Sequence, residues 1–275
     1  MELIDTHCHL TFDDLARDID GVIARSKAAG VTGWITIGTD PQHNRKAIEL
    51  TGKFENMYAA IGIHPHDAKD VTADALTELK ELAQGEKVVA IGETGLDFHY
   101  NFSNQPDQKR AFAQQLKIAR ELNLPVIVHC REAFDETMDI LEQFGPGVKP
   151  VVFHCFSGSA EQAKIVLDKG FYISFTGVVT FKNAELTRQA AGIVPADRLM
   201  LETDCPYMSP EPIRKQKINE PALMVHTAKY LAELKQMDLA DFAQAVTATS
   251  RKFFALPEAP STRAQDIRAK RGLIT

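Results

Sequence analysis

Leu3-Ile4-Asp5-Thr6-His7-Cys8-His9 begins with apolar residues and ends in two imidazoles. Four later runs have the same form, a short apolar stretch that ends in a side chain able to bind a metal. They are Val88–Glu93, Val126–His129, Val151–His154 and Leu199–Asp204. Short runs rich in Val and Ile are typical of strands buried in a parallel sheet. In a barrel of parallel strands the C-terminal strand ends meet at one mouth, so we expect these polar side chains to converge there.

Strand-like runs alternate with segments of helical periodicity along the chain. The runs cover residues 3–9, 33–38, 57–63, 87–92, 125–129, 151–154, 171–175 and 199–203. Helical spacing is clear between them, for example in Phe112, Leu116, Ala119 and Leu122. Eight alternations predict an α/β fold, a single-domain (β/α)8 TIM barrel. A doubly wound open sheet is the alternative, but it explains less well why polar ligands end both the first strand and the last.

Length and composition fit one large globular domain. The chain has 275 residues, 44% hydrophobic and 25% charged, with a formal net charge of −6. We assign residues 1–256 to the barrel and residues 257–275 to a C-terminal extension. No apolar run approaches the roughly 18 residues of a membrane span, and the first strand starts within two residues of the N-terminus. We therefore expect no signal peptide and a cytoplasmic location.

Four imidazoles and two carboxylates make up the predicted metal site. His7 and His9 are two residues apart on a strand, so both side chains share one face. We predict that one or two divalent cations bind to His7, His9, Glu93, His129, His154 and Asp204. Imidazole-rich ligation suits Zn²⁺, whereas a site that also holds carboxylates accepts Mg²⁺ or Mn²⁺.

Glu93 and Asp204 are the predicted catalytic carboxylates. A carboxylate can bridge two cations about 4 Å apart, which is the role expected for Glu93. Asp204 is expected to ligate a metal and to take the proton from the attacking water. His64, Arg131 and Lys182 are the predicted substrate contacts, and the Arg131 guanidinium can hold a phosphate through two hydrogen bonds. For His64, proton shuttling and direct metal ligation remain alternatives.

Four other residues near the predicted ligands are cysteines, namely Cys8, Cys130, Cys155 and Cys205. Neighbouring side chains on a strand point to opposite faces, so cysteines next to inward-facing ligands should point outward to the helices. There they serve as small apolar side chains. Disulfides are not expected in a cytosolic chain. For Asp97 we favour a structural role over one in orienting a metal ligand.

Six motifs in order resemble those of the TatD family of metal-dependent deoxyribonucleases, within the amidohydrolase-like metal barrels. They are Asp5–Leu10, Gly62–His66, Gly92–Asp97, His129–Arg131, His154–Gly158 and Glu202–Tyr207, followed by Asn219-Glu220-Pro221. The resemblance implies a TIM barrel with two divalent cations on the same six ligands. It also implies hydrolysis of phosphodiester bonds in DNA by a 3′ to 5′ exonuclease, with single-stranded ends as substrate and RNA as a further one.

One segment departs from the family pattern. Between Pro210 and Asn219 the family usually has a Gly within an Arg-rich stretch. Here the Gly is absent, and Ile218 replaces the Arg that usually precedes Asn219. The departure bears on the strength of phosphate or strand binding.

Two other functions fit parts of the pattern. Metal barrels of this shape also hydrolyse small esters, amides or lactones, and the fold alone does not exclude that chemistry. Small-amide hydrolases of this kind often bridge their metals with a modified Lys, whereas this chain has Glu93, which favours phosphodiesters. A non-enzymatic metal or nucleic-acid binding module is the third hypothesis, and the net negative charge disfavours it.

Overall fold

The structure is a computed structural model that describes residues 1–100, 102–148 and 150–257. Its strands form one eight-stranded sheet in the order β1 to β8, and each strand runs parallel to the next. They are β1 (Leu3–Cys8), β2 (Val31–Ile37), β3 (Met57–Ile61), β4 (Val88–Asp97), β5 (Val126–Arg131), β6 (Val151–Phe153), β7 (Tyr172–Phe175) and β8 (Leu199–Leu201). Of the predicted extension 257–275, only Pro257 lies within the described residues.

Hydrogen bonds between the first and last strand regions close the sheet. The Thr6 hydroxyl donates to the Leu201 carbonyl at 2.9 Å. Just beyond β8, the Asp204 amide donates to the His7 carbonyl, also at 2.9 Å. The architecture is therefore the predicted (β/α)8 TIM barrel, and the open doubly wound sheet is wrong.

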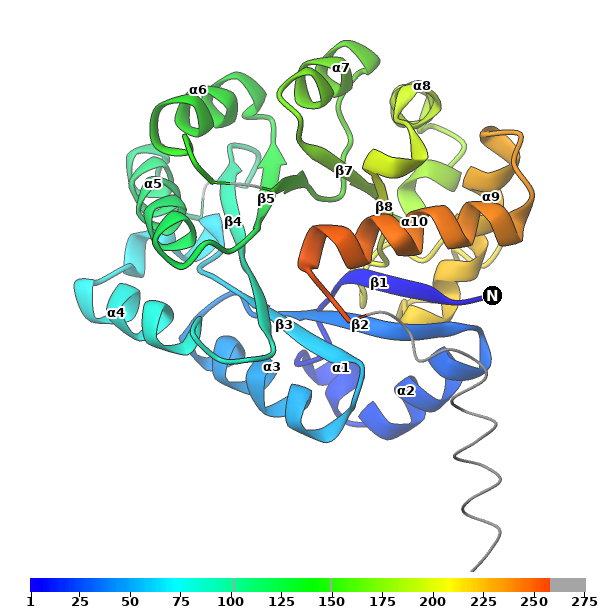
Figure 1. The fold of residues 1–275 in the computed structure, drawn as a ribbon, viewed down its shortest axis with the longest axis horizontal. Helices are drawn as coiled ribbons and strands as arrows, with labels where there is room; N and C mark the ends of the chain where they lie inside the picture. Colours follow the sequence, from blue (N-terminus) through cyan, green and yellow to red (C-terminus); the bar gives the residue numbers. More distant parts are fainter. Residues whose placement is uncertain (101, 149, 258–275) are drawn as a thin grey trace, which may run out of the picture.

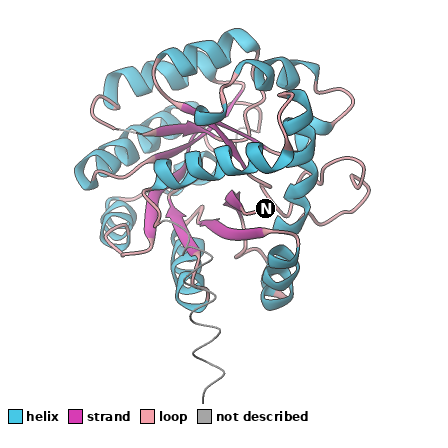
Figure 2. Ribbon diagram, turned by 45° about the vertical axis from the view of Figure 1, so that its right-hand side comes forward, coloured by secondary structure: helices cyan, strands magenta, loops and turns pink. Residues whose placement is uncertain are grey.

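Helices surround the barrel (Figure 1), and the strands lie inside them (Figure 2). The α-helices are α1 (Asp13–Ala16), α2 (Ile19–Ala28), α3 (Pro41–Lys53), α4 (Ala73–Leu82), α5 (Gln105–Leu122), α6 (Phe134–Phe144), α7 (Ala160–Asp168), α8 (Glu185–Ile193), α9 (Met224–Leu234) and α10 (Leu239–Phe254). Short 3-10 turns cover Pro65–Asp70, Gly177–Thr180, Ala196–Arg198 and Pro221–Leu223. None of the helices in the described ranges is both long and apolar enough to cross a membrane.

The last helix closes the end of the barrel opposite the predicted site. Helix α10 crosses in front of the strands in Figure 1. Phe253 and Phe254 at its end pack into an inner cluster with side chains from seven strands, including Ile35, Ala90 and Tyr172. Tyr172 is the first residue of β7, so this cluster fills the N-terminal end of the barrel. The polar side chains of the predicted site therefore lie at the other, C-terminal end of the barrel.

Two of the four cysteines pack outward as predicted, and all four thiols are free. Cys8 and Cys205 are fully buried in the outer apolar cluster. Cys130 packs partly against that cluster and also borders the cavity at the C-terminal mouth, so it fits the prediction only in part. For Cys155 the prediction is wrong, because its side chain lines the cavity at the C-terminal mouth. Strand β6 ends at Phe153, so the strict alternation of side chains no longer applies at Cys155.

Strand β4 is longer than the predicted run, which ended at Gly92. It pairs with β5 as far as Asp97, and the pairing register shifts between Ile91 and Thr94. Gly92 and Gly95 have φ angles of 151° and 144°. A Cβ on Gly95 would lie 2.0 Å from the His129 carbonyl oxygen. Both strands therefore approach so closely here that no side chain fits, and this approach sets the position of Glu93 beside His129.

Gly95→Ala should destabilise the fold strongly, because the new Cβ clashes with backbone and the φ angle is unfavourable. We expect a loss of about 3 kcal/mol or more and a fall in Tm of roughly 6 °C or more. Gly52→Ala is the matched control, since Gly52 lies in α3 with nothing within 4 Å of the added Cβ. It should be neutral or stabilising by up to about 1 kcal/mol. Equal thermal unfolding curves for both variants would show that β4 and β5 are not so tightly fitted.

Candidate metal centre

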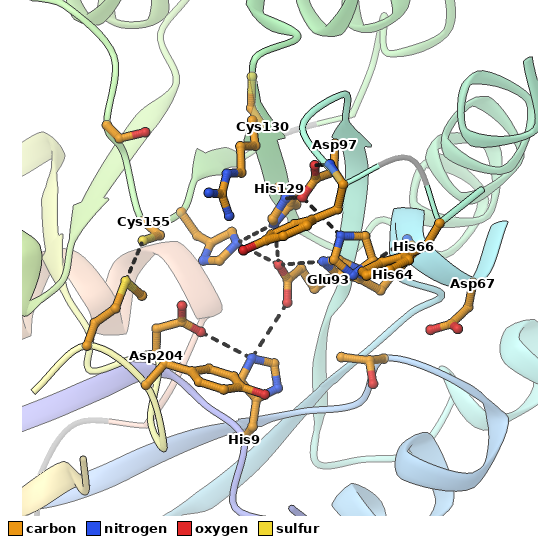
Figure 3. Close-up of a pocket in the computed structure, with 18 of the residues that line it drawn as sticks. His9, His64, His66, Asp67, Glu93, Asp97, His129, Cys130, Cys155 and Asp204 are labelled. Carbon is orange, nitrogen blue, oxygen red and sulfur yellow. Dashed lines mark hydrogen bonds and ion pairs between the residues drawn. The ribbon is translucent and has the colours of Figure 1, made fainter. Parts of the chain in front are cut away.

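The six predicted ligands converge at the C-terminal mouth of the barrel. His7 lies on β1, Glu93 on β4 and His129 on β5. His9, His154 and Asp204 each follow the end of a strand, β1, β6 and β8 respectively. Figure 3 shows Glu93 at the centre of the group.

One oxygen of Glu93 faces a first cluster, made of His7, His9 and Asp204. The Nε2 atoms of His7 and His9 lie 3.3 Å apart. Asp204 Oδ1 is 3.2 Å from His9 Nε2 and 3.6 Å from His7 Nε2. Glu93 Oε2 is 3.3 Å from His7 Nε2 and 3.7 Å from His9 Nε2.

The other oxygen of Glu93 faces a second cluster, made of His64, His129 and His154. Glu93 Oε1 is 2.7 Å from His129 Nδ1 and 2.7 Å from His154 Nε2. The same oxygen lies 3.3 Å from His64 Nε2. His64 was predicted first as a substrate contact, and the structure places it among the candidate ligands.

The donor set fits divalent cations. Ring nitrogens and carboxylate oxygens from separate strands point at common centres, and the His7, His9 and Asp204 atoms all lie within 4.8 Å of one another. The Nε2 atoms of His7 and His9 lie 3.3 Å apart, so in the tautomers that leave both atoms unprotonated they can coordinate one shared cation. Glu93 presents one oxygen to each cluster, which is the arrangement of a bridging carboxylate.

Electrostatics keep both carboxylates ionised. Burial alone would raise the pKa of Glu93, but the charge of His154 and the hydrogen bond with His129 outweigh it and hold that pKa well below its ordinary value. The pKa of Asp204 is likewise lowered despite burial, chiefly through its hydrogen bond with His9. Ionised carboxylates are the metal-binding form.

The imidazoles differ in protonation. Burial lowers the pKa of His64 to about 4 and also lowers that of His7, so both rings are neutral and ready to bind a metal. Burial opposes the charge of His154 as well, yet Glu93 and Glu202 raise its pKa well above the ordinary value. Because a metal-bound imidazole is neutral, metal binding at His154 should release a proton.

Asp97 orients the second cluster. One of its oxygens lies 3.0 Å from His129 Nε2 and 3.0 Å from His66 Nε2. The other oxygen accepts backbone hydrogen bonds from His99 and Tyr100. Asp97 therefore fixes the turn after β4, as the favoured structural role predicts, and also holds the His129 ring with Nδ1 toward Glu93.

Glu202 is a buried carboxylate at the start of the motif Glu202–Tyr207. The sequence alone predicts no role for it. It accepts hydrogen bonds at 2.6 Å from the Cys155 amide and from the Ser174 hydroxyl. Its Oε1 lies 3.6 Å from His154 Nδ1. This carboxylate therefore supports the side of the His154 ring away from Glu93, as a carboxylate behind a metal-binding imidazole does.

The clusters open into a cavity of about 750 Å³. Arg131 and His64 line it, together with several aromatic side chains, and their predicted substrate contacts stay predictions. Lys182 is not among the lining residues, so its predicted substrate contact stays a prediction. Ile218, at the departure from the family pattern, is exposed, while the next residue, Asn219, is buried and holds the loop after β8 through bonds to Thr203 and Tyr207.

Comparisons with known proteins identify the family. Residues 4–255 match the family model described as TatD related DNase. The chain belongs to the TatD family. A relative from Bacillus subtilis, described as the uncharacterized metal-dependent hydrolase YabD, is 41% identical over 92% of this chain and 99% of its own length. A Shigella flexneri relative named 3′-5′ ssDNA/RNA exonuclease TatD is 36% identical over 92% of this chain and 99% of its own.

A solved TatD-family structure agrees with the fold. The Escherichia coli protein YJJV, described as a TatD homolog, is 30% identical and superposes with a TM-score of 0.88, covering 93% of this chain and 98% of the other. Together these findings show that this TatD-family chain is a metal-dependent hydrolase built on a TIM barrel.

Proposed function

We propose that this TatD-family hydrolase cleaves phosphodiester bonds in nucleic acid, removing nucleotides from the 3′ end of single-stranded DNA and also of RNA. The observation that carries the proposal is the division of Glu93 between two clusters of ligands. A pair of divalent cations about 4 Å apart suits in-line displacement at phosphorus. The relative named as a 3′-5′ ssDNA/RNA exonuclease supports the same chemistry.

Each cluster would hold one cation, Mg²⁺, Mn²⁺ or Zn²⁺. His7, His9 and Asp204 would hold the first, His64, His129 and His154 the second, and Glu93 would contact both. Cations bound there would lower the pKa of an attacking water and stabilise charge on the leaving oxygen.

Asp204 is the proposed acceptor of the proton from the attacking water. Its carboxylate lines the cavity, so it can reach a water there, and its lowered pKa keeps it ionised. Arg131 would bind a phosphate of the substrate strand. Its guanidinium is exposed, lines the cavity and forms no ion pair with any of the residues that the structure describes.

A comparison of substrate classes tests the proposal. Metal-loaded protein is given a single-stranded oligonucleotide, p-nitrophenyl acetate, a cyclic amide and a lactone, and kcat/KM is measured for each. We expect turnover of the oligonucleotide alone. Efficient hydrolysis of the ester, amide or lactone without cleavage of the oligonucleotide would overturn the proposal in favour of a small-molecule hydrolase.

Arg131→Met should weaken substrate binding while leaving the metal clusters intact. The Met keeps an apolar stem against Tyr100 but removes the charge that would meet a phosphate. We expect KM for single-stranded DNA to rise about tenfold, and the slope of log KM against log salt to fall by roughly 0.7. Lys164→Met, on the outer helix α7, is the charge-matched control and should change neither quantity. An unchanged salt slope in Arg131→Met would remove Arg131 from phosphate binding.

A further inference from the structure

The exposed aromatic side chains of this protein gather at one place. Within the described ranges, the aromatic residues that are more than a third exposed are Tyr100, Phe102 and Tyr207, at 47%, 57% and 54%. All three line the cavity over the metal clusters. Exposed aromatic surface is costly in water, so its confinement to the substrate cavity points to a ligand that covers it.

Tyr100 and Phe102 form a first surface, at the end of the barrel mouth nearest the second cluster. Their rings are 5.6 Å apart and only 4° from parallel. That distance exceeds the roughly 3.5–4 Å of two rings stacked directly over each other, so the rings are offset and each leaves part of its face uncovered by the other. The His66 ring meets both edge-on, at 5.6 Å and 4.8 Å, and His66 in turn is held by Asp97.

Tyr207 and Phe12 form a second surface, next to the first cluster. The Phe12 ring stacks on the His9 ring at 4.7 Å and 17°. Tyr207 meets Phe12 edge-on at 6.4 Å and follows the ligand Asp204 by three residues. Because Glu93 separates the first cluster from the second, the two aromatic surfaces belong to opposite ends of the metal centre.

We propose that the two surfaces bind the bases of the two nucleotides joined by the scissile phosphate. The inference rests on the proposed function and names how its substrate is held. Every base has a flat π-face, so stacking on exposed rings binds single strands with little sequence preference. Duplex DNA buries those faces within its own stack, so the same surfaces select single-stranded ends.

Arg131 fixes the direction of the strand. Its guanidinium lies over the Tyr100 ring, with Cζ 4.6 Å from the ring centroid. The scissile phosphate joins the last two nucleotides of the strand. The 3′-terminal nucleotide ends in a hydroxyl, so only the upstream nucleotide carries a second phosphate, on its 5′ side. The surface next to this cation therefore takes the upstream base, and the surface of Phe12 and Tyr207 takes the 3′-terminal base.

Variants and modified substrates together test this assignment. The variants are Tyr100→Leu/Phe102→Leu and Tyr207→Leu, which keep apolar bulk but lose the π-face. Each is assayed for KM on three 5′-labelled single strands, one intact, one abasic at the 3′-terminal nucleotide and one abasic at the penultimate nucleotide. Leu186→Ala is the matched control, because it changes an exposed apolar residue of α8 outside the cavity. It should behave as wild type, and thermal unfolding checks that every variant folds.

We expect Tyr100→Leu/Phe102→Leu to raise KM for the intact strand by about tenfold or more. The increase in KM caused by this double variant should shrink to less than about twofold on the strand that lacks the penultimate base, because the contact is already absent there. On the strand that lacks the terminal base, the increase should persist. Tyr207→Leu should show the reverse pattern. Equal effects with and without the base, or no effect at all, would overturn the inference, and exchanged patterns would overturn the strand direction. Failure of the wild type to cleave any of the strands would instead overturn the proposed function, and would be seen before any variant is compared.

Discussion

Asp204→Asn should lower kcat by about 10²–10⁴-fold and leave the barrel folded. The carboxylate that would accept the proton becomes an amide that cannot accept it. The substitution suits the backbone, because Asp204 has a φ of 52° and Asn is among the residues that tolerate this left-handed conformation. The backbone bond from residue 204 to the His7 carbonyl does not depend on the side chain and should persist.

Single-turnover rates on single-stranded DNA measure this effect, with thermal unfolding as the check on the fold. Asp67→Asn is the matched control, since Asp67 lines the same cavity but belongs to none of the candidate ligand groups of the described residues. Its rate should stay close to that of wild type. A rate for Asp204→Asn similar to that of Asp67→Asn would remove Asp204 from the chemistry.

Glu93→Gln should have the largest effect on metal binding. Glu93 is only 3% exposed, and its two oxygens serve the two clusters separately. A glutamine offers one carbonyl oxygen and turns an NH₂ group toward the other set of imidazoles, so both clusters lose the negative charge and one also loses its oxygen ligand. We expect bound metal to fall from two cations per chain to one or none. Turnover should fall by on the order of 10³-fold or more, because one cation's charge stabilisation is lost.

Metal content after dialysis, measured by mass spectrometry, separates this prediction from a simple loss of activity. The Asp67→Asn control should retain the wild-type metal content. Two cations per chain in folded Glu93→Gln would show that Glu93 does not bridge them.

Most of the fold and the convergence of the six predicted ligands could be predicted from the sequence because each signal is local. A short apolar run followed by His, Glu or Asp, such as Val126–His129, predicts a buried strand and indicates that the strand ends at the mouth of the barrel. In a parallel barrel the strand ends meet, so local signals are enough to bring distant residues such as His7 and Asp204 together.

The remaining features depend on contacts that no local pattern records. His64 comes after β3 and was recognised as an imidazole at the mouth, but its distance to Glu93 depends on the path of the following turn. Strand β4 runs on to Asp97 because Gly92 and Gly95 allow a close approach to β5. Cys155 departs from strand alternation because β6 is only three residues long.

The aromatic surfaces were also missed, although a sequence signal exists. Tyr100 and Phe102 follow the end of β4, and Tyr207 follows Asp204 closely. Aromatic residues in loops just beyond ligand-bearing strand ends are candidates for substrate contact, since these loops form the mouth of the barrel. Whether such an aromatic side chain packs in the core or lies on the surface depends on its exposed fraction, which only the structure gives.

Metal add-back to stripped protein tests the central claim most directly. The protein is freed of metal, supplied in turn with Mg²⁺, Mn²⁺ or Zn²⁺, and incubated with 5′-labelled single-stranded DNA while bound metal per chain is counted. We predict no cleavage without a cation and, with at least one of the three, a ladder that shortens from the 3′ end at two cations per chain. Protein that binds cations but leaves the strand intact with all three, or stripped protein that cleaves equally well, would contradict a metal-dependent nuclease.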